Sequence, residues 1–238
     1  MRYESSINSV RQFNKGYKTM DSAEIGQHSQ VGYSILKQNF AASYKLIYAY
    51  LRSFMNQKTG IAMVSIKNLM MKTGYSNDTI DRAIKALKNA GVIEVERRRK
   101  VTKDNVTTYN VYRFPKLEGD MFAMISFYFL ESDLLTTKEK EFILLIFPKI
   151  LTNDCIGSIE NPMFVPQIAE YTEMSRPTVK QRIKSLEKKG LVRENWSRIS
   201  GSHIPEMVGY EFDMKQIMLN ATKNLMQERN ELMEALLQ

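Results

Sequence analysis

The sequence has a single cysteine, Cys155, and only two histidines, His28 and His203. One cysteine excludes a disulfide within the chain and any zinc site built from clustered cysteines, so we interpret Cys155 as a small half-buried hydrophobic residue. The two histidines lie in different segments, and no cysteine or carboxylate cluster surrounds them at metal-ligand spacing. We therefore expect no metal site and no other cofactor.

Catalytic and membrane-spanning signatures are missing as well. The sequence has no Gly-x-x-x-x-Gly-Lys-Ser/Thr phosphate loop and no nucleophile elbow, so we predict that the protein is not an enzyme and has no catalytic residues. No apolar run approaches the roughly 20 residues of a membrane helix, and the polar N-terminus lacks the apolar core of a signal peptide. We expect a cytoplasmic protein without a membrane partner.

Positive charge is in excess, and it is unevenly distributed. The formal net charge is +8 and the pI is about 9.4, which fits a polyanionic partner. Residues 40–114 contain 14 Lys/Arg against 5 Asp/Glu, whereas residues 119–213 contain 11 against 14. The first half of the chain therefore carries most of the positive field.

One pattern occurs twice. The stretch Ser175–Val192 begins with a serine suited to cap a helix, continues with apolar residues at helical spacing, and ends at a glycine followed by an apolar pair. The stretch Ser76–Ile93 repeats it without a gap, and every equivalent pair lies 99 positions apart. The pairs are Ser76/Ser175, Thr79/Thr178, Ile80/Val179, Ile84/Ile183, Leu87/Leu186 and Gly91/Gly190. A repeat of this length indicates duplicated domains rather than a solenoid, whose period is about 20–50 residues.

The order helix, glycine, strand resembles the recognition helix and first wing strand of a winged helix-turn-helix domain. In the first copy we expect helices at 43–55 and 66–73, the Ser76 helix, and wing strands at 92–99 and 106–114. In the second copy we expect helices at about 136–151 and 166–172, the Ser175 helix, and a wing within 193–212.

The predicted fold class is mainly α with small β wings (α+β), as two tandem winged helix-turn-helix domains plus a C-terminal helix. The predicted parts are a flexible N-terminal arm at 1–32, the first domain at 33–114, a linker at 115–119, the second domain at 120–213 and the C-terminal helix at 214–238. That helix has a broad apolar face, which either packs on its own domain or pairs two chains. A homodimer is therefore left open.

The outer faces of the two recognition helices contain the candidate contacts with double-stranded DNA. Arginine can bond guanine in a bidentate manner and glutamine can bond adenine in the same way. The first helix is less basic, with net charge +1 over 76–90 against +5 over 175–189, because Asp78 and Asp81 offset its cations. A basic run at the tip of the first wing compensates for this. The predicted DNA-binding residues are Ser76, Asn77, Thr79, Arg82 and Lys85 in the first helix, Arg97, Arg98, Arg99, Lys100 and Lys103 in the wing, and Ser175, Arg176, Thr178, Lys180, Gln181 and Lys184 in the second helix.

The segments Phe122–Ser126 and Leu134–Glu141, with the Ser-Arg-Pro-Thr-Val helix and the Lys-Lys-Gly-Leu-Val turn that follow them, resemble helix-turn-helix proteins of bacterial phages and plasmids. The resemblance covers residues 33–213 in two copies and implies DNA binding. It favours a transcriptional regulator that occupies an operator. A replication initiator or plasmid-maintenance protein is the first alternative, and a winged-helix protein-interaction module is the second.

Overall fold

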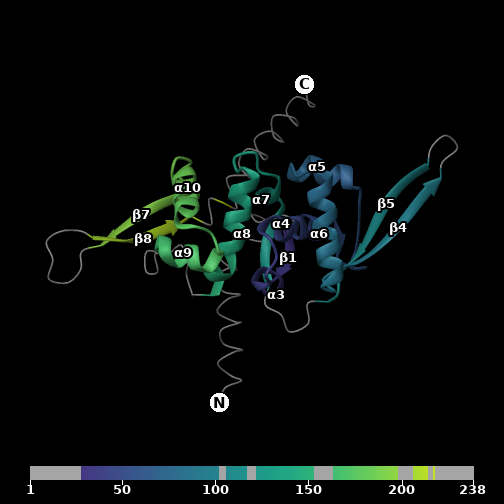
Figure 1. The fold of residues 1–238 in the computed structure, drawn as a ribbon, viewed down its shortest axis with the longest axis horizontal. Coiled ribbons are helices and arrows are strands. Elements are labelled where there is room, and N and C mark those ends of the chain that lie inside the picture. The colour runs from purple at the N-terminus through teal and green to yellow at the C-terminus, as the bar shows by residue number, and fades with distance from the viewer. Residues whose placement is uncertain are drawn as a thin grey trace, which may run out of the picture. The chain divides into compact units, whose positions relative to one another are not determined.

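The computed structural model describes residues 28–101, 106–116, 122–152, 163–197, 206–213 and 217 (Figure 1). Contacts divide these residues into two compact units. The first unit comprises Gln27–Glu131 and Leu135–Leu144, and the described part of the second comprises Ser132–Leu134 and residues from Leu145 onward. Both units combine helices with small antiparallel sheets, so the predicted fold class is confirmed.

The first unit contains a complete winged helix. Its elements are α4 (Ala42–Ser53), β2 (Met55–Asn56), β3 (Ile61–Val64), α5 (Ile66–Thr73), α6 (Asn77–Asn89), β4 (Glu94–Val101) and β5 (Val106–Arg113). The strands form one antiparallel sheet in the order β2-β3-β5-β4. The three helices and two wing strands lie within a few residues of their predicted positions, whereas β2 and β3 were not predicted.

Helical spacing explains which side of α6 is buried. Ile80, Ala83 and Leu87 are fully buried and recur every three or four residues, so they lie on one face of the helix. Removing a large apolar side chain from water stabilises the fold by about 1.5–3 kcal/mol. Leu46 and Leu51 of α4 are equally buried, and the opposite face of α6 remains polar and exposed.

A second pattern, which the sequence did not reveal, precedes each copy. Strand β1 (His28–Gly32) leads directly into α3 (Tyr33–Lys37), and β6 (Phe122–Ser126) leads directly into α7 (Phe127–Glu131). The two strands pair antiparallel, with Gln30 opposite Met124. All four elements belong to the first unit. The predicted linker at 115–119 lies mostly outside the described residues and stays a prediction.

In both copies a buried lysine of the next long helix binds the short helix that follows the leading strand. The ammonium of Lys45 donates to the carbonyl of Leu36 at 2.6 Å, and that of Lys140 donates to the carbonyl of Leu130 at 2.5 Å. These pairs are 94 or 95 positions apart instead of 99. The difference falls in α8 (Thr137–Thr152), which has 16 residues where α4 has 12. Four extra residues make about one helical turn, so the buried face of the helix is preserved.

The second unit contains the other helix-turn-helix. Its described elements are the end of α8, α9 (Val165–Thr172), α10 (Arg176–Glu187), β7 (Val192–Ser197) and β8 (Glu206–Phe212). Strands β7 and β8 pair antiparallel with an irregularity at Asn195/Trp196, and Met163 forms an isolated bridge with Tyr210. The predicted helices and wing are confirmed. Residues 1–27 of the predicted N-terminal arm and most of the predicted C-terminal helix lie outside the described residues. The last five residues of the predicted arm, 28–32, form strand β1 instead of a flexible segment.

Candidate nucleic-acid interface

Both recognition helices begin at a serine cap. The hydroxyl of Ser76 accepts a hydrogen bond from the backbone N–H of Thr79, and that of Ser175 accepts one from Thr178, each at 3.3 Å. The two hydroxyls of each pair lie 3.0 and 2.8 Å apart. These four predicted DNA-binding residues therefore determine where each helix begins, and contact with DNA stays a prediction for them.

The turn before each recognition helix contains a left-handed residue. In the first copy this residue is Gly74, with φ 72°, and glycine adopts this conformation without steric cost. In the second copy Glu173 takes the equivalent position with φ 56°, and it is the one non-glycine residue with positive φ in the described part of the chain. The backbone of the second turn is therefore more strained than that of the first.

The outer face of α10 is basic and exposed. Arg176, Lys180, Gln181 and Lys184 are all exposed, while Val179 and its apolar partners on the inner face are buried. Among the residues that the structure describes, none forms a hydrogen bond or ion pair with these four side chains. Three cations and one amide are thus presented together on a rigid helix.

On α6 the corresponding face is partly neutralised by its own carboxylates. The guanidinium of Arg82 lies 2.9 Å from the carboxylate of Asp78, and the amide of Asn77 donates to Asp81 at 3.2 Å. Lys85 is exposed. The Arg82–Asp78 pair is mostly solvated and contributes little stability, but it holds the arginine against the helix. The outer faces of α6 and α10 therefore differ in charge and in the pairing of their side chains.

The wing arginines divide between the two faces of β4, because successive side chains of a strand point to opposite sides. The guanidinium of Arg98 forms two bonds with the carboxylate of Glu96, at 2.8 and 2.9 Å. This pairing holds the pKa of Glu96 below its usual range and raises the pKa of Arg98. Arg98 is therefore already paired within the wing.

Arg97 and Arg99 point to the other face. Arg97 lies opposite Asn110, whose amide donates to the hydroxyl of Tyr112 at 3.0 Å. Burial raises the pKa of Tyr112, the hydrogen bond with Asn110 lowers it, and the nearby Asp81 of α6 raises it, so Asp81 lies near this face of the sheet. Figure 1 shows β4 and β5 as a long hairpin that begins near one end of α6 and extends away from it. Arg97 and Arg99 are exposed on this face of the hairpin, and their contact with DNA stays a prediction.

The remaining wing residues add less. Lys100 lies in β4, and Lys103 lies outside the described residues. In the second wing the guanidinium of Arg193 pairs with Glu211 at 2.8 Å. Trp196 is 56% exposed and its indole N–H donates to Glu194 at 3.0 Å. Trp196 was not among the predicted site residues, although it is the one tryptophan of the chain.

No metal site appears in the part of the chain that the structure describes, where no three His, Cys, Asp or Glu side chains cluster as ligands. His28 lies at the start of β1, while Cys155 and His203 are outside the described residues. None of the described helices combines the length and the apolar character needed to cross a bilayer.

Two segments match known family models. Residues 42–93, from the start of α4 to the residue before β4, match a model described as a helix-turn-helix domain. Residues 159–194, which include α9 and α10, match a model described as a bacterial regulatory protein of the arsR family. No curated protein matches the chain. The chain thus carries two helix-turn-helix domains in tandem.

Proposed function

We propose that this protein is a transcriptional regulator of the phage or plasmid type, which binds a specific double-stranded DNA operator through both helix-turn-helix domains. The observation that carries the proposal is the outer face of α10, where Arg176, Lys180, Gln181 and Lys184 are exposed on a rigid helix. The match of this region to a bacterial regulatory protein supports it.

In this proposal α10 reads base edges in the major groove. Arg176 and Gln181 can form the bidentate bonds with guanine and adenine that distinguish one base pair from another. Lys180 and Lys184 have no fixed planar donor pair, and they bind phosphates instead. Contacts of both kinds are needed, since phosphate contacts fix the register in which the bases are read.

The first domain contributes mainly phosphate contacts. The aspartates of α6 would repel phosphates, whereas Arg97 and Arg99 are exposed cations in the wing that follows that helix. In this proposal α10 of the second domain recognises the bases, and the wing of the first domain attracts the phosphates.

A selection experiment tests base reading by α10. Duplexes retained by the full chain from a random library would define the site, and Arg176→Ala and Gln181→Ala would each be measured on that site and on random duplex. We expect each substitution to cost about 1–3 kcal/mol on the selected site and less on random DNA. Lys188→Ala is the control, because it removes an exposed charge near the C-terminal end of the helix. Equal losses on all sequences would show that these residues bind only phosphate.

A replication initiator or plasmid-maintenance protein is the second candidate. It is favoured by the presence of two winged helices in one chain, since two reading heads suit repeated sites. Sequencing genomic fragments retained by the protein distinguishes the two, because an operator lies at a promoter and an initiator site is an array of repeats. If the chain retains no duplex DNA at low salt, the winged helices are protein-interaction modules.

A further inference from the structure

The turn between α5 and α6 is held by residues that the sequence repeat assigns to the second copy. A threonine backbone carbonyl and the side chains of a tyrosine and a lysine around this turn contact the end of α7 and the first two turns of α8. All of these residues belong to the first unit. Part of the second copy therefore packs against the helix-turn-helix of the first copy.

Two hydrogen bonds join the turn to α8. The hydroxyl of Thr137 donates to the backbone carbonyl of Thr73 at 2.9 Å, and the hydroxyl of Tyr75 donates to the carboxylate of Glu141. Thr73 is the last residue of α5, where carbonyls have no partner within the helix. The first bond thus satisfies one such carbonyl, and the second fixes the residue just before the Ser76 cap.

Glu141 is buried, which makes its partners necessary. Its side chain is 4% exposed, and Lys138 provides the second bond to its carboxylate at 2.9 Å. A buried carboxylate that loses a donor incurs a desolvation cost that the bond previously offset. Burial and this hydrogen bond also raise the pKa of the Tyr75 hydroxyl, so the tyrosine stays protonated as the donor.

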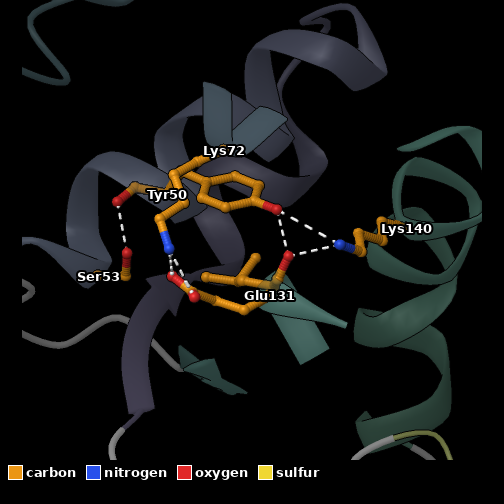
Figure 2. Close-up of polar contacts among 6 residues, drawn as sticks. Tyr50, Ser53, Lys72, Glu131 and Lys140 are labelled. Atoms are coloured by element: carbon orange, nitrogen blue, oxygen red, sulfur yellow. Dashed lines mark hydrogen bonds and ion pairs between the residues drawn. The ribbon is translucent and has the colours of Figure 1, made fainter. Parts of the chain in front are cut away.

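Figure 2 shows a second group of contacts beside this turn. The ammonium of Lys72 in α5 binds the carboxylate of Glu131 at the end of α7 at 2.6 Å. The hydroxyl of Tyr50 in α4 donates to the carbonyl of Leu130, which also accepts from the buried Lys140 at 2.5 Å. Both helices that precede α6 are therefore attached to α7 and α8.

We propose that Tyr75, Glu141 and Thr137 are positioning residues that fix the orientation of α6 for DNA binding. This inference rests on the function proposed above. The turn sets the angle between α5 and α6, and that angle decides which α6 side chains reach the duplex. The second copy has Met174 where the first has Tyr75, and methionine has no hydroxyl with which to form the equivalent bond. Only the helix-turn-helix of the first copy depends on this contact.

Full-length Tyr75→Phe and Thr137→Val variants test the proposal. Affinity for a labelled mixed-sequence duplex of about 30 base pairs would be measured against salt concentration, well below the melting temperature of each variant. We expect each variant to bind about three- to tenfold more weakly, because the competent orientation of α6 is less populated. The magnitude of the salt slope should also fall, by about 0.9 for each phosphate that the variant no longer binds.

Matched variants separate positioning from general stability. Tyr171→Phe removes a tyrosine hydroxyl from α9 of the second head and should leave affinity and slope unchanged. Glu141→Gln keeps an acceptor for Tyr75, so it should weaken binding less than Tyr75→Phe. Amide exchange in α6 should be faster in Tyr75→Phe and unaltered in Tyr171→Phe.

A loss of thermal stability in Tyr75→Phe and Thr137→Val with no change in affinity, salt slope or α6 exchange would overturn the proposal. Should one variant fail to fold, the other decides the question by the same measurements. The proposed function fails in a different way, because then the wild-type chain itself would show no salt-dependent binding to the duplex.

Discussion

The division of the wing arginines between two faces of β4 leads to a quantitative prediction. Replacing Arg97 and Arg99 by alanine removes two exposed cations from the face of the sheet that carries Tyr112. Replacing Arg98 removes a cation of the same type from the opposite face, where Glu96 binds it at 2.8 Å. The strand supplies the control, since all three residues are adjacent and exposed.

The expected magnitude follows from counterion release. Each bound phosphate contributes about 0.9 to the slope of log affinity against log salt, so a variant that binds two fewer phosphates has a slope smaller by about 1.8. The gap between wild type and the double variant should then shrink about twelvefold when salt rises fourfold, from about 50 to about 200 mM. For Arg98→Ala we expect a slope within about 0.3 of wild type.

Fluorescence anisotropy with a mixed-sequence duplex measures both slopes, and circular dichroism checks that the variants are folded. An unchanged slope in the double variant would place both arginines in solvent. A slope that falls as much in Arg98→Ala would show that the two faces of the wing are equivalent. Either result would refute the assignment of one face to DNA.

Three further predictions concern other parts of the chain. Glu173→Gly should raise the free energy of unfolding by about 0.5–1 kcal/mol in chemical denaturation, because glycine adopts the left-handed conformation without strain; no gain would mean that the strain is offset elsewhere. Asp78→Asn with Asp81→Asn should raise affinity for random duplex at low salt, and unchanged affinity would place α6 away from phosphates. A fragment of residues 28–144 should unfold cooperatively, whereas a fragment of 28–116, which lacks β6, α7 and the start of α8, should not.

Much of the fold followed from apolar spacing and glycine positions. The pattern Ile80, Ile84, Leu87 identified the buried face of α6, and Gly91 identified its end. These signals are local, since a helix face and a cap depend on residues within a few turns. The same locality explains why the wing strands were predicted from the apolar pair that follows the glycine.

The missed features depend on distant partners. Strands β1 and β6 are short and pair across about 90 intervening positions, so neither shows its structure in its own sequence. The sequence alone does not show that, among the described residues, Arg98 is paired and Arg97 is not, because this difference comes from the strand register and from the carboxylate of Glu96. The contact of Tyr75 with Glu141 is likewise invisible until the first turns of α8 are placed against α5.

The repeat and the folding units follow different boundaries, and the pairing of β1 with β6 is the physical reason. A two-stranded sheet needs both strands, because an unpaired strand leaves backbone groups without partners. The leading strand and short helix of the second copy are therefore retained in the first unit, where Phe129 and Leu130 are buried. Once α7 lies there, the first turns of α8 must start beside α5. Helix α7 and the start of α8 thus give α5 and the turn before the first recognition helix contacts that a single winged helix would lack.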